Sequence, residues 1–269
     1  MKQKTIKKSF EISGAGLHHG GKTRIIFHPS EENSGILIKI NGINFHMDVS
    51  SVISTQRGTD VCFNNSRIST VEHLLAGIKG LGIDNVILEI CGNEIPILDG
   101  SSKIFCEKLI KNGIISQNKA RKEFKIRKSV LISNNGKYIA VLPSDSFKVY
   151  YFSDFSDYGI KPDFWGGKIT PEFFYKNISG SRTFGFKSEI EILRQKGLIK
   201  GATLKNAVLI DNGKPVNTKL RFKNELLRHK ILDIIGDMAY VPGYLKICII
   251  AYKTGHTENI MMVKELLKN

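Results

Sequence analysis

Apolar and polar residues alternate along many short segments of the chain, and this period of two is typical of half-buried β-strands. Glycine and asparagine bound several of these segments, and Asn41-Gly42 is a strong signal for a hairpin turn. We expect strands at residues 5–10, 23–27, 36–40, 43–47, 61–63, 86–90, 124–132, 138–142, 148–152, 207–210 and 246–252.

Other segments carry apolar residues at helical spacing. Ser69 and Glu72 have the spacing of a capping box, in which two side chains satisfy backbone amides at the start of a helix. The segment that ends at Met238 has the strongest helical pattern in the chain. We expect helices at residues 72–79, 101–111, 171–177, 188–196, 225–238 and 261–267.

The order of these elements predicts the fold class. Strands come in runs with a few helices between them, which favours an α+β fold over strict alternation of strand and helix. Residues 114–124 are polar and basic without a clear period, so we interpret them as a linker. The sequence therefore predicts two α+β domains, residues 1–117 and residues 118–269, each with a histidine early in a helix, His73 and His229.

Composition narrows the class of protein. The chain has 269 residues, 41% of them hydrophobic, which is enough for two buried cores. Its formal charge of +15 indicates either an acidic partner or a generally basic surface, since the lysines are scattered. The four cysteines form no CxxC pair and are typical of free thiols in a reducing compartment. No apolar segment follows the basic N-terminus, and Lys246 interrupts the longest apolar stretch, so we expect a cytoplasmic protein without a transmembrane segment.

The most informative segment is RHKILDIIGD, at residues 228–237. His229 and Asp233 are four residues apart, so on a helix they share one face and could bind one metal ion. Asp237 lies four residues further, where a carboxylate could orient a histidine near that metal. A polar surface stripe held by salt bridges would have the same spacing.

Three further segments have two interpretations each. Glu72 precedes His73 as a catalytic base would precede a metal-binding histidine, although the pair also suits an exposed helix start. His256 lies in a predicted loop and is either a general acid or a solvated histidine. Thr183 either donates to an oxyanion or caps the next helix. The sequence has no motif of a P-loop, a serine nucleophile or a dinucleotide site.

Taken together, these segments resemble the UDP-3-O-acyl-N-acetylglucosamine deacetylase family, the zinc enzymes of lipid A synthesis in Gram-negative bacteria. The resemblance covers nearly the whole chain and keeps the family's order. The matching segments are GAGLH at residues 14–18, RISTVEHL at 67–74, GLGIDN at 80–85, EIPILDGS at 94–101, SRTFGF at 181–186, RHKILDIIGD at 228–237 and YKTGH at 252–256.

The resemblance implies a metal site and an acid–base pair. By similarity, His73, His229 and Asp233 are the zinc ligands, which leaves a fourth position for water. The same ligand set also suits Fe(II). Glu72 matches the family's general base, and His256 matches the histidine that stabilises the oxyanion and protonates the leaving amine.

The remaining site residues follow from the same resemblance. Asp237 would hold His256 in its charged form, and Thr183 would donate to the oxyanion. Lys230 matches a lysine near the substrate phosphates, and Phe184 a phenylalanine that packs on the sugar. Phe155 resembles an aromatic residue that stacks on uracil.

The family also has a passage for the substrate's acyl chain, built from an insert in the second half. Here that insert corresponds to residues 197–211, and His18 aligns with a family histidine near the substrate. The small or apolar residues that would line the passage are Ile199, Gly201, Ala202, Thr203, Ala207 and Leu209.

The resemblance therefore implies removal of acetate from UDP-3-O-(3-hydroxyacyl)-N-acetylglucosamine, the committed step of lipid A and hence lipopolysaccharide biosynthesis. It implies two similar layered domains, each a β-sheet packed on helices, with the active site at their interface. We expect a monomer that binds a UDP-linked acylated amino sugar and no nucleic acid. Two alternatives are a basic α+β module that binds nucleic acid without a metal, and a zinc amidase for another acetylated sugar.

Overall fold

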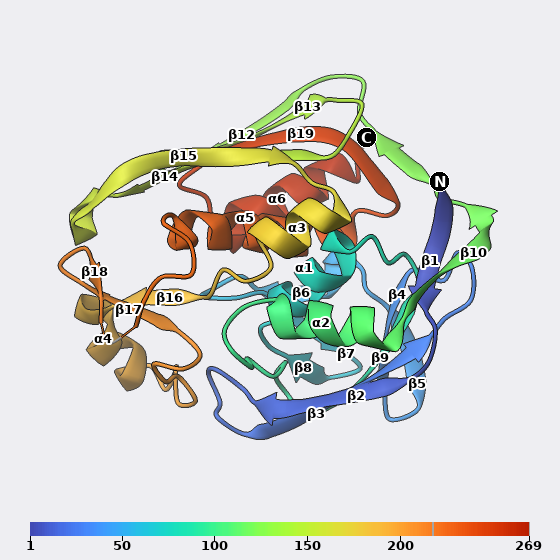
Figure 1. The fold of residues 1–269 in the computed structure, drawn as a ribbon, viewed down its shortest axis with the longest axis horizontal. Coiled ribbons are helices and arrows are strands. Elements are labelled where there is room, and N and C mark those ends of the chain that lie inside the picture. Colours follow the sequence, from blue (N-terminus) through green and yellow to red (C-terminus); the bar gives the residue numbers. More distant parts are fainter. Residues whose placement is uncertain (217, 269) are drawn as a thin grey trace.

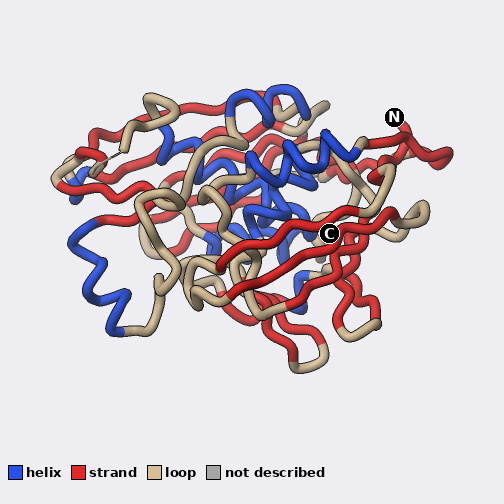
Figure 2. The backbone as a smooth tube through the Cα atoms, turned by 60° about the horizontal axis from the view of Figure 1, so that its bottom comes forward, coloured by secondary structure: helices blue, strands red, loops and turns tan. Residues whose placement is uncertain are grey.

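Two β-sheets form the outside of the molecule and helices fill the space between them (Figure 1). The computed structural model describes residues 1–216 and 218–268. Figure 2 shows the same arrangement from another side, with most of the helices between the two groups of strands. The prediction of an α+β fold with two layered domains is confirmed. Within the described residues, no helix is both long and apolar enough to cross a membrane.

The first sheet has five strands in the order β2–β3–β9–β4–β5. Its alternating pattern buries Phe27 and Leu88 completely, in one hydrophobic core with Leu74 and Phe105 of the nearby helices. The elements of this half are β2 Phe10–Ala15, β3 Lys22–Pro29, β4 Ile36–Ile40, β5 Ile43–His46, β6 Val52–Ser54, β7 Asp60–Phe63, β8 Ser66–Ile68, α1 Glu72–Gly80, β9 Val86–Cys91 and α2 Lys103–Asn112.

The second sheet has the order β12–β13–β19–β14–β15, with β11 beside β19. The inward side chains Val149, Tyr151 and Ile249 are buried and join the same core. The elements of this half are β11 Glu123–Lys125, β12 Val130–Asn134, β13 Lys137–Pro143, β14 Lys148–Phe155, β15 Ile160–Lys168, α3 Pro171–Asn177, α5 Glu225–Asp237, β19 Tyr244–Tyr252 and α6 His256–Leu266.

A small lobe projects from the second half, at the lower left of Figure 1. It has its own core, made by Phe186, Val208, Ile210 and Leu226. Its elements are β16 Phe184–Phe186, α4 Ile190–Gln195, β17 Val208–Asp211 and β18 Lys214–Pro215.

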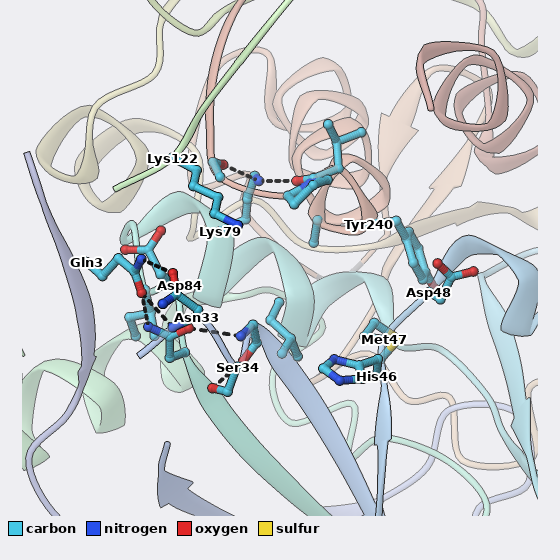
Figure 3. A pocket seen from close by; sticks show the side chains of 18 of the residues that line it. Gln3, Asn33, Ser34, His46, Met47, Asp48, Lys79, Asp84, Lys122 and Tyr240 are labelled. Atoms are coloured by element: carbon cyan, nitrogen blue, oxygen red, sulfur yellow. Dashed lines mark hydrogen bonds between the residues drawn. The ribbon is translucent and has the colours of Figure 1, made fainter. Parts of the chain in front are cut away.

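Helices α1 and α5 join the two halves by a very close contact. A Cβ atom on Gly236 of α5 would lie only 2.2 Å from the carbonyl oxygen of Glu72 in α1, so only glycine permits this approach. At the other end of α1, Lys79 donates hydrogen bonds to the carbonyls of Val241 (2.7 Å) and Gly243 (2.9 Å) in the second half. A cavity of about 410 Å³ lies beside this lysine and separates parts of the two halves (Figure 3).

The structure corrects the linker prediction. Residues 114–124 are not a linker but contain strand β10, Ile114–Ala120, which pairs with β1, Lys2–Ile6. Most side chains of β10 are exposed, so the backbone pairs without leaving an alternating pattern in the sequence. The proposed domain boundary after residue 117 falls inside this strand. The strand expected at residues 5–10 is likewise the end of β1 and the start of β2.

Candidate metal centre and active site

Helices α1 and α5 bring together the three residues that were expected to bind a metal. His73 lies in the first turn of α1, and His229 and Asp233 lie one turn apart on α5. One potential ligand atom from each lies within 4.8 Å of the others, and all three residues are buried. The Asp233 Oδ1 atom is 3.3 Å from His229 Nε2 and 4.0 Å from His73 Nε2.

The protonation states and free polar atoms of these three side chains suit the binding of a cation. Asp233 Oδ1 is buried and has no hydrogen-bond partner among the described residues, and a carboxylate oxygen of this kind beside two imidazoles is a suitable ligand atom for a cation. Burial lowers the pKa of His73 to about 3 and also lowers the pKa of His229, so both rings are neutral and keep a free lone pair. The His229 Nδ1 atom lies 3.1 Å from the Ser181 carbonyl, which directs its Nε2 lone pair toward Asp233.

Asp233 is ionised. Burial alone would raise the pKa of its carboxyl, but the Lys230 ammonium and the cationic His256 ring hold that pKa well below its usual range. Lys230 Nζ donates to Asp233 Oδ2 at 2.8 Å. The set of two neutral histidines and one carboxylate is that of catalytic zinc sites with an open fourth position.

Glu72 faces this cluster from the start of α1. Its carboxylate accepts a hydrogen bond from the Thr59 amide at 2.9 Å, and burial raises its pKa to about 7. The predicted capping box is wrong, because the N-cap residue is Val71 and its side chain makes no cap hydrogen bond. Thr70 has a left-handed backbone (φ 61°), which turns the chain just before the helix and leaves Glu72 pointing into the site.

His256 was expected in a loop, but it is the first residue of helix α6. Its Nδ1 atom lies 2.8 Å from Asp237 Oδ2, and its Nε2 atom lies 3.9 Å from both Glu72 Oε1 and Asp233 Oδ2. Burial alone would lower the pKa of His256, but Asp237 and Asp233 raise it to about 10. A cationic imidazole therefore faces Glu72 beside the metal cluster.

Two residues that hold Asp237 were missed. Thr59 Oγ1 donates to Asp237 Oδ1 at 2.8 Å, and Asn259 Nδ2 donates to Asp237 Oδ2 at 2.9 Å. Asn259 lies three residues after His256, so the two share a helix face. That spacing would have revealed Asn259 if the helix had been predicted to begin at residue 256 instead of 261.

The cluster opens into a cavity of about 380 Å³ between the two halves. Thr183, Phe184, Lys230 and Phe155, which the sequence predicts to contact a substrate, line this cavity. The rings of Phe155 and Phe184 meet edge to face with centroids 5.4 Å apart, and Lys230 Nζ lies 5.6 Å from the Phe184 centroid. Thr183 is held by hydrogen bonds between its backbone and Gly100 and Val208, and does not cap a helix.

A second cavity, of about 320 Å³, adjoins the first at Thr183 and Phe184. His18 lines this cavity, and neither of its ring nitrogens has a hydrogen-bond partner among the described residues. Leu17 and Leu193 were not foreseen in its wall, because one precedes the insert and the other belongs to α4. Five of the six residues expected from the insert do line this cavity, namely Ile199, Ala202, Thr203, Ala207 and Leu209.

Gly201 is the exception in the insert. Its amide donates to the Leu17 carbonyl at 3.0 Å, and a Cβ atom on it would lie 2.0 Å from the carbonyl oxygen of Gly16. Gly201 therefore lets the insert pack directly on the backbone of the first half, instead of contributing to the wall.

Comparison with known proteins places the chain in a family. The family model described as UDP-3-O-acyl N-acetylglycosamine deacetylase matches residues 3–268. The chain belongs to this family. Proteins named UDP-3-O-acyl-N-acetylglucosamine deacetylase are similar to it in Oleidesulfovibrio alaskensis (40% identity, 96% of this chain and 87% of the relative) and in Nitratidesulfovibrio vulgaris (40%, 100% and 89%). The relative from Histophilus somni is 38% identical over 100% of this chain and 91% of its own length.

Proposed function

We propose that the protein is a zinc-dependent deacetylase that removes acetate from UDP-3-O-(3-hydroxyacyl)-N-acetylglucosamine. The observation that carries the proposal is the cluster of His73, His229 and Asp233, with an unpartnered carboxylate oxygen, beside Glu72 and a cationic His256. Family membership and the printed names of the relatives supply the substrate. In this proposal the protein acts as a cytoplasmic monomer in the committed step of lipid A biosynthesis.

A divalent metal held by the cluster would polarise the amide and lower the pKa of the attacking water. Glu72 takes a proton from that water as it attacks the acetamide carbonyl, because its carboxylate lies beside the cluster and is shielded from solvent. His256 starts the reaction protonated, stabilises the negative charge on the carbonyl oxygen and then gives its proton to the leaving amine. Thr183 donates a second hydrogen bond to that oxygen.

The two adjoining cavities match a substrate with a polar and an apolar part. In the first cavity, Phe155 stacks on uracil, Phe184 packs on the sugar and Lys230 contacts the phosphates. In the second cavity, the apolar wall contributed by residues 197–211 surrounds the acyl chain. His18 lies where this chain joins the sugar, with two ring nitrogens available for polar contact.

The decisive experiment is a deacetylation assay with metal-depleted and zinc-restored protein, supported by two variants. We expect about one zinc per chain, and we expect His229→Ala to lose both metal and turnover because it removes a ligand. Glu72→Gln keeps the metal and loses turnover by about 100-fold or more, because it removes only the base. His28→Ala, on the outer face of the first sheet, is the matched control and keeps both.

Four results would contradict the proposal in whole or in part. A folded, fully active protein without metal would refute the metal mechanism. If Fe(II) but not zinc fully restored turnover to the metal-depleted protein, the assigned metal would be wrong and the assigned reaction would stand. Turnover of another acetylated sugar, or binding of RNA by a metal-free protein, would favour the alternatives of a different amidase or a nucleic-acid-binding module.

A further inference from the structure

The outer face of the second sheet carries large apolar side chains. In β14, Tyr151 points inward and is buried, so its neighbour Phe152 points outward, and Phe164 lies directly opposite on β15. The two phenylalanine rings are 4.2 Å apart, and Phe164 is 49% exposed. We call the following set the aromatic face: Leu131, Tyr138, Phe152, Phe164, Ile250 and Tyr252.

The aromatic face is continuous across the sheet. Tyr252 of β19 lies opposite Phe152 on one side and opposite Tyr138 of β13 on the other. Leu131, on the edge strand β12, is 67% exposed. In Figure 1 this sheet lies at the top, with the helices α3, α5 and α6 all beneath it, and no described element covers its outer side. A contiguous exposed apolar surface of this kind marks an interaction site.

The first sheet shows that the architecture does not require such a face. Its outer side is the counterpart in the same layered fold, but it carries charged side chains that pair with one another. Glu11 accepts from Arg24 at 3.5 Å, and Glu89 accepts from both Lys39 (3.1 Å) and His28 (2.9 Å). Ile26 and Ile87 also lie on this outer side, but they are half-buried, so the large exposed apolar side chains of the aromatic face have no counterpart there.

Lysines border one end of the aromatic face, whereas Asp154 at the other end pairs with Lys253 at 3.3 Å and accepts a hydrogen bond from the Tyr252 hydroxyl at 3.4 Å. Lys148 of β14 and Lys168 of β15 lie directly opposite each other and on the same side as Phe164. Like charges at such a position repel, so the pair is disfavoured unless negative charge lies nearby. Lys148 has one acidic neighbour, Asp145, at 3.4 Å, and the chain as a whole carries +15. Aromatic rings bordered by lysines are typical of surfaces that bind at the interface of an anionic bilayer.

We propose that the aromatic face docks the protein onto an anionic membrane surface. The rings would enter the headgroup region while Lys148 and Lys168 contact the lipid phosphates. Lys137 and Lys253 lie next to Tyr138 and Tyr252 in the chain and line the active-site cavity, where each has an acidic partner, Glu258 and Asp154 respectively. Docking would therefore bring that cavity near the bilayer. A second copy of the chain fits less well, because it would bring two surfaces of like charge together.

Flotation of the full-length protein with lipid vesicles tests this docking and needs neither metal nor substrate. We compare vesicles of phosphatidylcholine alone with vesicles that also contain phosphatidylglycerol. Binding is expected only to the anionic vesicles, and it should weaken as salt is raised. Phe152→Thr/Phe164→Thr should abolish it, and Lys148→Gln/Lys168→Gln should weaken it by about fivefold for each lysine removed.

The matched control removes the same charge from the first sheet. Arg24→Gln/Lys39→Gln should reduce vesicle binding by less than about twofold, because those residues face away from the docked surface. Equal weakening by both double variants would mean that only net charge matters, and would overturn the proposal. The proposal would also be overturned if the folded wild-type protein did not bind anionic vesicles. It would likewise be overturned if the protein were a dimer in solution and Phe152→Thr/Phe164→Thr dissociated that dimer.

Discussion

Three side chains converge on Asp237, and this single carboxylate connects both halves of the molecule to the chemistry. Thr59 reaches it from the first half, and Asn259 and His256 reach it from α6. Two neutral donors fix the position of the carboxylate, and its charge keeps the His256 imidazole protonated. The proposed acid therefore depends on residues that contact neither metal nor substrate.

Thr59→Val tests this dependence. The variant keeps the volume of the side chain but leaves Asp237 with one hydrogen bond fewer, worth about 1 kcal/mol. We expect turnover to fall by about five- to tenfold with unchanged metal content, since Thr59 does not contact the cluster. Thr59→Ser, which restores the hydroxyl, should recover most of the rate and the pH profile of the wild type. Loss of metal in Thr59→Val would contradict a positioning role.

Sequence reasoning reached one part of this site and missed another for a physical reason. His229 and Asp233 lie on one regular helix, so their spacing alone indicated a shared face. Glu72 was ambiguous, because the left-handed backbone at Thr70 that turns it inward leaves no regular pattern in the sequence. The link between His73 and α5 is a tertiary contact, and only the family resemblance anticipated it.

At the scale of elements, helix α5 is anchored at its start by a buried ion pair. Glu225 accepts hydrogen bonds from Arg182 Nε (2.7 Å) and from the backbone amides of Arg182 (3.0 Å) and Arg221 (2.6 Å). Burial alone would raise the pKa of Glu225, but the hydrogen bonds from Arg182 hold it below its usual range. This anchor sets the axial position of the helix that carries His229.

The pair makes stability depend on pH in a definite direction. Because the pKa of Glu225 is lower in the folded state than in the unfolded one, its stabilisation is complete above about pH 4.5 and is lost as the pH falls through its folded value. Glu225→Gln leaves Arg182 charged and unpaired, so we expect a loss of about 3–5 kcal/mol in the free energy of unfolding at neutral pH.

Urea denaturation of wild type and Glu225→Gln at neutral and acidic pH measures this effect. The difference between the two proteins should shrink on acidification, and a constant difference would contradict the assignment. Glu172→Gln is the matched control, because its partner Lys176 is exposed and the pair contributes little at any pH.

Two element boundaries could not be predicted, and the reasons differ. Strand β10 gains its hydrogen bonds from β1, far away in the chain, and it buries too little to show an alternating pattern. Helix α6 begins at His256 because the Glu258 side chain accepts from the Gly255 amide. Residues 256–259 are polar because His256 and Asn259 bind Asp237 and because Glu258 bonds to the Gly255 amide, so they lacked the apolar spacing of a helix.

For the whole molecule, the clasp made by Lys79 is one feature that joins the halves away from the active site. Its side-chain nitrogen, whose pKa burial lowers to about 7, donates to two carbonyls of the loop that follows α5, next to the cavity of about 410 Å³. Lys79→Met would leave both carbonyls without this donor. We expect a loss of about 1–3 kcal/mol in the free energy of unfolding. Thermal denaturation should show it as a fall of a few degrees in Tm.

Lys111→Met is the matched control for the clasp. Lys111 occupies the last turn of α2 as Lys79 occupies the last turn of α1, but it is exposed. Both variants lose the favourable interaction of a lysine with the end of a helix, so only the difference between them reports on the two carbonyls. Equal Tm values for the two variants would refute the clasp.

The glycine contact between α1 and α5 has a consequence for how the protein fails under stress. At Gly236 the two backbones touch without a side chain between them, so no flexible group can absorb a shift of one half against the other. The proposed ligands are divided across that contact, with His73 on one side and His229 and Asp233 on the other. A displacement too small to expose the core that the two halves share is therefore enough to pull the ligand set apart. On heating, the bound ion should therefore dissociate while both sheets are still folded, so that metal loss precedes global unfolding.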